Sequence, residues 1–202
     1  MYTCFRVAGS WEFDIKIKKG EKLMLTIDNT VLLLIDVQGK LAEIMYDKDK
    51  LFASLETIIQ AMKILDIPVI WMEQVPESIG NTIPQLAELL PDIKPIAKNT
   101  FSCCSNQEFM DKFDSLGRGK VLLTGIETHI CIYQTGIDLI KAGYDVQIVA
   151  DCVSSRTKEN KAIGMDRIKQ AGGSVTSNEM IFFELMKAAK GNKFKQIIKL
   201  IK

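Results

Sequence analysis

The stretch VLLTGIETHICIYQTGIDLIKAG, residues 121–143, decides which fold this sequence adopts. It begins with a short apolar run that predicts a buried strand, turns at Gly125, and continues with apolar residues at helical spacing. Cys131 falls at the start of the predicted helix, where the positive end of the helix dipole favours a thiolate over a thiol. The alternative is that Cys131 is a small buried hydrophobic residue.

Strands and helices alternate along the rest of the chain. Residues 31–35 are apolar at every position, which is typical of a central parallel strand. Residues 68–72, 145–150 and 175–176 predict three more strands. The alternation predicts an α/β fold: a three-layer, doubly wound domain with a mainly parallel sheet of five or six strands and helices on both faces. Helices are expected over residues 51–65, 82–90, 105–115 with Ser105 as N-cap, 157–172, 178–189 and 193–202.

The composition limits the partners of this protein. The 202 residues fit one domain, and 26 basic residues nearly balance 25 acidic ones, giving a net charge of +1. We therefore expect neither nucleic acid nor a membrane surface as a partner. The longest apolar run, residues 31–35, is too short to span a bilayer.

The cysteines and the single histidine limit the chemistry further. The sequence has five cysteines at uneven spacing and one histidine, His129. An odd set of cysteines favours free thiols and a cytoplasmic location. One histidine excludes a histidine-based metal cage, and neither glycine-rich nucleotide fingerprint is present. We expect no metal and no cofactor.

Residues 1–23 differ in pattern from the rest of the chain. They contain Gly-Ser and Glu-Phe dipeptides of the kind that cloning sites encode, so we interpret them as a leader or an added extension. The alternative is a natural extension in which Phe13, Ile15 and Ile17 alternate as a short strand. The domain itself is expected over residues 24–202.

Three ionisable residues are predicted to meet at one edge of the sheet. Asp36 directly follows a strand, Cys131 begins a helix after another, and Lys98 lies near the end of a third segment. A carboxylate can accept a thiol proton, and an ammonium stabilises the resulting charge. Taken singly, Asp36 could equally cap a turn, and Lys98 could be a solvated surface residue.

Three segments carry a family resemblance. Residues 33–38 (LLIDVQ), 96–102 (IAKNTFS) and 125–131 (GIETHIC) resemble the signature segments of the isochorismatase-like cysteine hydrolases. The resemblance runs in order from about residue 25 to the C-terminus. Residues 73–76 (EQVP), Gly80, Thr176-Ser177 and the ending at residues 194–202 resemble most the isochorismatase domain-containing subfamily.

The resemblance implies roles for individual residues. Cys131 would be the nucleophile, Asp36 the general base and acid, and Lys98 the electrostatic support. The family carries a cis peptide five residues before the cysteine, here between Ile126 and Glu127, and the N–H groups of Glu127 and Cys131 would form an oxyanion hole. The implied activity is metal-free hydrolysis of a small amide or related acyl compound through a thioester.

Two other functions stay open, together with the assembly and the pocket. The chain could hydrolyse a vinyl ether of the isochorismate type, or it could be a catalytically idle scaffold for protein association. An apolar stripe at residues 194–201 and the habit of the family predict a homo-oligomer, a dimer or tetramer. The residues expected to line a pocket for a small-molecule substrate are Gln38, Trp71, Glu73, Phe101 and His129. The alternative for His129 is a polar residue that fixes the nucleophile turn.

Overall fold

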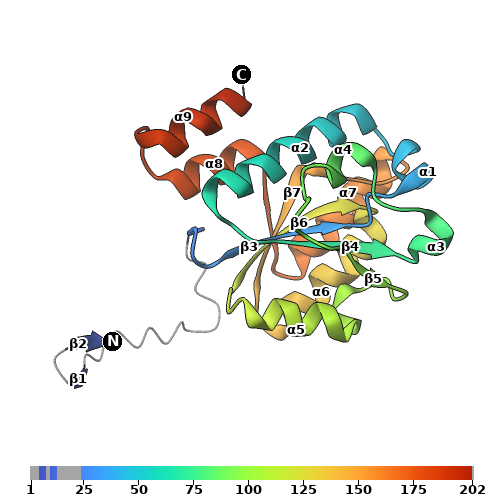
Figure 1. The fold of residues 1–202 in the computed structure, drawn as a ribbon. Helices are drawn as coiled ribbons and strands as arrows, with labels where there is room; N and C mark the ends of the chain where they lie inside the picture. Colours follow the sequence, from blue (N-terminus) through green and yellow to red (C-terminus); the bar gives the residue numbers. More distant parts are fainter. Residues whose placement is uncertain (1–4, 8–9, 13–23, 202) are drawn as a thin grey trace.

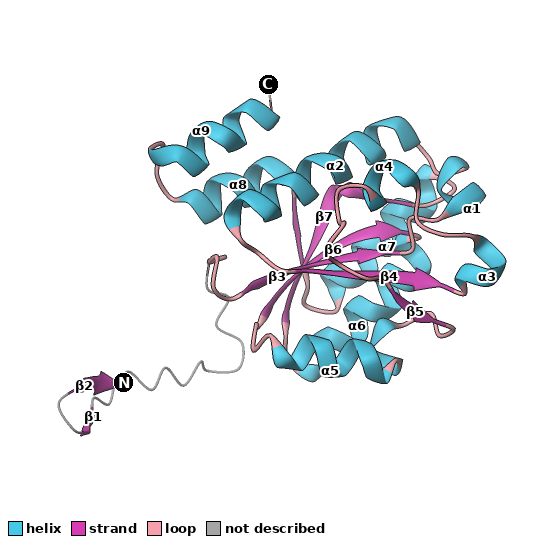
Figure 2. Ribbon diagram, viewed as in Figure 1, coloured by secondary structure: helices cyan, strands magenta, loops and turns pink. Residues whose placement is uncertain are grey.

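The computed structural model describes residues 5–7, 10–12 and 24–201. Within these residues, six strands form one sheet in which every neighbouring pair is parallel, in the order β5-β4-β3-β6-β7-β8, and helices pack on both faces (Figures 1 and 2). The predicted doubly wound α/β fold is therefore confirmed. The strands are β3 (Thr30–Ile35), β4 (Val69–Gln74), β5 (Ile96–Lys98), β6 (Lys120–Ile126), β7 (Asp145–Ser154) and β8 (Ser174–Thr176).

The N-terminal segment contributes a separate small hairpin. β1 (Phe5–Val7) and β2 (Ser10–Glu12) pair antiparallel and do not join the main sheet. The rest of the segment interpreted as a leader, including the alternating residues 13–17, lies outside the described residues. The domain boundary at residue 24 stays a prediction.

Helices connect the strands. They are α1 (Gly39–Glu43), α2 (Lys48–Leu65), α3 (Pro76–Ile79), α4 (Pro84–Ala87), α5 (Gln107–Ser115), α6 (Tyr133–Ala142), α7 (Lys158–Gln170), α8 (Asn178–Met186) and α9 (Gly191–Leu200), with a 3-10 turn η1 (Cys103–Ser105) and a π-helical turn η2 (Thr128–Ile132). No helix among the described residues is long and apolar enough to cross a membrane.

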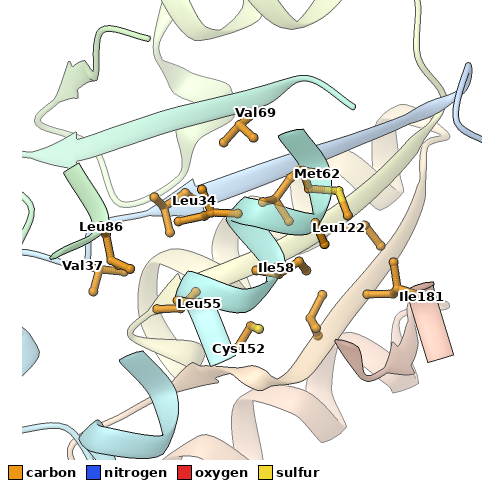
Figure 3. Close-up of a cluster of buried hydrophobic side chains, with 14 of the residues drawn as sticks. Leu34, Val37, Leu55, Ile58, Met62, Val69, Leu86, Leu122, Cys152 and Ile181 are labelled. Carbon is orange, nitrogen blue, oxygen red and sulfur yellow. The ribbon is translucent and has the colours of Figure 1, made fainter. Parts of the chain in front are cut away.

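The core lies on both sides of β3, whose six residues are all buried. Alternate side chains of a strand point to opposite faces, so Leu34 packs in the cluster beneath α2 and Leu33 packs in the cluster on the other face. Figure 3 shows Leu55, Ile58 and Met62 of α2 lying over the sheet. Burial on both faces explains why residues 31–35 have no polar position.

Helix α5 begins one residue later than predicted. Asn106, not Ser105, is its N-cap, and the Asn106 side chain accepts a hydrogen bond from the Phe109 N–H at 2.9 Å. Ser105 is the last residue of the 3-10 turn η1, so the polar residue next to it takes the capping position. The predicted start at Thr157 is confirmed, because its side chain caps α7 by accepting from the Asn160 N–H at 3.2 Å.

The C-terminal apolar stripe packs mainly within the chain. Ile197 is fully buried, and Leu200 and Ile201 pack partly buried against the same core that α2 covers. The stripe was the sequence argument for an oligomer, and this packing explains it without a second copy. The oligomer itself stays a prediction.

The order in which strands are added to the sheet reverses at β3. Strands β3, β4 and β5 step toward one edge, after which β6 returns to the other side of β3. Gly125 lets β6 approach closely: its φ is +110°, and an added Cβ would lie 2.0 Å from the Ile35 oxygen. In open α/β sheets, ligands bind beyond the carboxyl ends of the strands at such a reversal. Asp36 and Cys131 follow the two strands that meet there.

Candidate active site

Asp36 is the first residue after β3. Its φ is +56°, so the chain turns sharply out of the strand, and its N–H donates to the Met72 oxygen of β4 at 3.1 Å. The Gln38 N–H then donates to the Asp36 oxygen at 2.9 Å. Aspartate tolerates the left-handed region better than most residues. The turn places the Asp36 carboxylate, 2% exposed, beyond the end of the central strand.

Lys98 is the last residue of β5, and its side chain crosses the end of β4 to reach Asp36. Strands β5 and β3 flank β4, which sets them about 10 Å apart. The Lys98 Nζ lies 2.7 Å from Asp36 Oδ2, and the two side chains are 0% and 3% exposed. Nζ also donates to Gln74 Oε1 at 2.5 Å and to the Thr100 oxygen at 3.2 Å. These acceptors satisfy the three N–H bonds of an ammonium.

Burial and charge act against each other in this ion pair. Burial raises the pKa of Asp36 and outweighs the opposing effects of Lys98 and, to a smaller degree, of the Cys131 thiol. For Lys98, burial lowers the pKa and the charge of the neighbouring Asp36 raises it, with a net increase. The site therefore combines a stable ammonium with a carboxylate that is more basic than usual.

Cys131 lies in the π-helical turn η2, which follows β6 and leads into α6. The structure contradicts the expectation of a thiolate: burial raises the pKa of Cys131 strongly, the charge of Asp36 raises it further, and Lys98 lowers it only in part. Cys131 is a thiol at rest and needs a base to become a nucleophile.

The turn before Cys131 carries the other predicted residues. The peptide bond between Ile126 and Glu127 is cis. The Glu127 side chain is buried, and its Oε2 accepts from the Arg156 N–H at 3.1 Å and from Arg156 Nε at 3.2 Å. His129 Nδ1 lies 3.0 Å from Ser155 Oγ. Both side chains thus tie the nucleophile turn to the connection between β7 and α7.

Two predicted pocket residues are occupied by protein contacts around Thr82. Glu73 Oε1 accepts from the Thr82 N–H at 2.7 Å and from the Thr82 hydroxyl at 2.8 Å. Trp71 Nε1 donates to the same hydroxyl oxygen at 2.7 Å. Trp71 also lines a cavity of about 630 Å³ at the outer edge of β4, together with Pro68, Val69 and other residues. That cavity lies toward the start of β4, whereas Lys98 is the last residue of β5 and Asp36 directly follows β3.

Besides His129, described above, the remaining predicted pocket residues are Phe101 and Gln38, and their environments differ. Phe101 is 55% exposed, and its backbone oxygen lies 3.4 Å from Lys98 Nζ, so it stands beside the site with its ring toward solvent. Gln38 is fully buried, and its amide group bonds to other parts of the chain. Within the described residues, no group of three or more histidine, cysteine or acidic side chains is arranged to hold a metal ion.

Gln74, Thr100 and Arg156 have contacts at the site that the sequence did not predict. Gln74 contacts Lys98, and Arg156 contacts Glu127. The available signal was position: Gln74 ends a strand at the same edge of the sheet as Asp36. No sequence signal pointed to Arg156. The strand before it was predicted to end at residue 150, but β7 continues to Ser154, which brings Arg156 to the site.

Comparison with known proteins identifies the family. The model of the isochorismatase domain matches residues 30–180. The chain belongs to the isochorismatase family. It is 34% identical to isochorismatase domain-containing protein 2 of Xenopus laevis over 86% of this chain and 83% of that protein. It is 35% identical to the secreted isochorismatase effector Isc1 of Phytophthora sojae, over 86% and 85% of the two chains.

A solved structure agrees with this membership. The MAR1 ribonuclease from Caenorhabditis elegans superposes with a TM-score of 0.83 at 32% identity, covering 89% of this chain and 92% of that one. The predicted family and its hydrolase fold are confirmed. As a member of this family, the chain has the fold of an isochorismatase-like hydrolase.

Proposed function

We propose that this protein is a metal-free cysteine hydrolase that cleaves a small amide or a related acyl compound through a thioester on Cys131. One observation carries the proposal. Asp36 Oδ2 is bound to Lys98, while Oδ1 is buried without a hydrogen-bond partner among the described residues, and the Cys131 thiol is near enough to affect the pKa of the same carboxyl group. Oδ1 is therefore available to receive the thiol proton.

The first half of the reaction forms the thioester. Asp36 takes the proton from the Cys131 sulfur as that sulfur attacks the carbonyl carbon of the substrate. The carbonyl oxygen becomes an oxyanion, which the backbone N–H groups of Glu127 and Cys131 stabilise. The tetrahedral intermediate collapses, the C–N bond breaks, and Asp36 returns the proton to the leaving nitrogen.

The second half releases the acid. Asp36 takes a proton from a water molecule as the oxygen of that water attacks the thioester carbon. Asp36 then returns the proton to the Cys131 sulfur when the C–S bond breaks. Lys98 remains an ammonium throughout, because its three donors are bound to acceptors and its pKa is raised. It orients Asp36 and offsets its charge.

The acyl reaction has better support than hydrolysis of RNA. The name of the C. elegans protein includes ribonuclease, but this chain has a net charge of +1 and only one histidine. A surface that binds nucleic acid normally carries a clear excess of basic residues. A buried thiol beside a carboxylate is suited to attack on a carbonyl group of a small molecule.

Two further proposals concern assembly and location. We propose a homo-oligomer of two or four copies, and the support is a set of exposed apolar side chains: Val175 on the edge strand β8, and Met180 and Phe183 on α8. We also propose a cytoplasmic location, because the described cysteines are free thiols. The relative from Phytophthora sojae is named as secreted.

The test of the reaction is turnover of a panel of small amides and esters by the wild-type protein and by Cys131→Ala. We expect at least one member to be hydrolysed and the rate to fall more than about 10³-fold in Cys131→Ala. Cys152→Ala is the matched control, because Cys152 is a buried thiol in the cluster beneath α2 and should retain activity. Equal turnover by wild type and Cys131→Ala would contradict the proposal, and no turnover of any member would favour the idle scaffold.

A further inference from the structure

Gln74 and Gln38 belong to a closed set of contacts behind the Asp36–Lys98 pair. Gln74 Oε1 lies 2.5 Å from Lys98 Nζ. An ammonium only donates hydrogen bonds, so the atom of the Gln74 amide that faces it is the carbonyl oxygen. Gln74 is 8% exposed, and this contact is formed out of water, where charge-assisted hydrogen bonds are strong.

The side-chain amide of Gln38 contacts both backbone polar groups of Gln74, its N–H and its carbonyl oxygen. Its Nε2 donates to the Gln74 oxygen at 3.0 Å, and its Oε1 accepts from the Gln74 N–H at 2.6 Å. The same Nε2 donates to the Gly80 oxygen at 2.6 Å. Gln38 is fully buried, so its amide is fixed by these contacts and has no solvent to compete with them.

The contacts form a ring. Gln38 is two residues after Asp36, it binds Gln74, Gln74 binds Lys98, and Lys98 binds Asp36 at 2.7 Å. Each member therefore restrains the next. A buried polar network in which the members are bonded fixes one geometry, whereas removal of one member leaves a buried donor unpaired.

We propose that Gln74 is a positioning residue: it fixes the Lys98 ammonium, with Gln38 as its anchor, so that Lys98 holds Asp36 Oδ2 and leaves Oδ1 without a hydrogen-bond partner among the described residues. Gln74 touches neither substrate nor sulfur in this account. The kinetic part of the inference rests on the proposed function, because it concerns how well Asp36 moves protons. The electrostatic part does not, because it concerns the thiol alone.

Two substitutions separate orientation from charge. Gln74→Met keeps the length of the side chain and removes the acceptor without adding charge, so kcat should fall about tenfold with KM within twofold, as expected when a general acid–base group loses its geometry. Gln74→Glu keeps the shape and places a negative charge beside the Lys98 ammonium, whose positive charge lowers the pKa of Cys131 in part. At pH 8.5, alkylation of Cys131 by iodoacetamide, assigned by peptide mapping, should be at least about threefold slower, since fewer thiolates form although each is more nucleophilic.

Gln170→Met and Gln170→Glu are the matched controls, because Gln170 is exposed at the end of α7. They should match wild type in both measurements. If Gln74→Met folds poorly, Gln74→Glu carries the test, because it retains the backbone contacts to Gln38. Unchanged alkylation in Gln74→Glu would overturn the inference, as would unchanged kcat in a folded Gln74→Met. A wild-type protein that hydrolyses no substrate while Gln74→Glu still slows alkylation would overturn the proposed function but support the placement of Gln74.

Discussion

At the scale of single residues, the two oxygens of Asp36 have different environments. Oδ2 is bound to Lys98, and Oδ1 has no partner among the described residues. The sequence placed Asp36 and Cys131 at one edge of the sheet, and it predicted a thiolate from the helix start and a neighbouring ammonium. It could not show that burial and the Asp36 charge raise the pKa of Cys131, because these depend on segments that meet only in the fold.

The ion pair predicts a specific dependence of stability on pH. The pKa of Lys98 is raised above its ordinary value of 10.5, so the folded state holds the proton more tightly than the unfolded chain does. Ionised Lys98 therefore contributes its full stabilisation below about pH 10.5, and this is lost as the pH rises through the raised pKa. Thermal unfolding between pH 8 and pH 11.5 should show a steeper alkaline decline in wild type than in Lys98→Met. Parallel curves would contradict this assignment.

At the scale of elements, the approach of β6 to β3 sets the distance between the nucleophile turn and the base. Residue Ile35 of β3 lies opposite Gly125 of β6, and Asp36 follows immediately. The sequence pattern predicted both strands, but it did not predict that they are adjacent in the sheet, since apolar runs carry no information on strand order. The glycine in the signature segment was visible in the sequence, and its positive φ and close approach to Ile35 give it a physical reason.

Gly125→Ala tests this packing. An added Cβ would lie 2.0 Å from the Ile35 oxygen, and φ is +110°, so we expect a loss of about 3 kcal/mol or more in the free energy of unfolding. Gly119→Ala is the control, because nothing lies within 4 Å of an added Cβ there and its φ is not in the left-handed region. Urea titration measures both. A loss below about 1 kcal/mol for Gly125→Ala would show that β6 shifts easily.

At the scale of the whole molecule, the sequence predicted the layers, the parallel sheet and the family, because each depends on local periodicity or on contiguous segments. It could not show which contacts distant residues make. Gln38 and Glu73 were expected to line a pocket, which stays a prediction, and the structure adds that their polar groups bond to Gln74 and Thr82. The C-terminal stripe was attributed to assembly, yet Ile197 is buried within the chain.

The proposed oligomer can be tested by light scattering at micromolar concentration. We expect the mass of two or four copies, and Phe183→Asp should lower it by placing a charge among the exposed apolar side chains of α8. Ile163→Asp is the matched control, because Ile163 is a similarly exposed apolar residue on α7. A wild-type mass of one copy would refute the oligomer, and an equal effect of both substitutions would refute the choice of surface.

We expect the Cys131 sulfur to form a covalent acyl intermediate, and intact-mass spectrometry during turnover detects such an adduct. With an activated ester that acylates the protein faster than water releases the product, we expect a mass increase of one acyl group on wild type, located on Cys131 by peptide mapping. Cys131→Ala should show no such increase, and Asp36→Asn should acylate at least about a hundredfold more slowly. An adduct on another cysteine, or the same adduct in Cys131→Ala, would contradict the account.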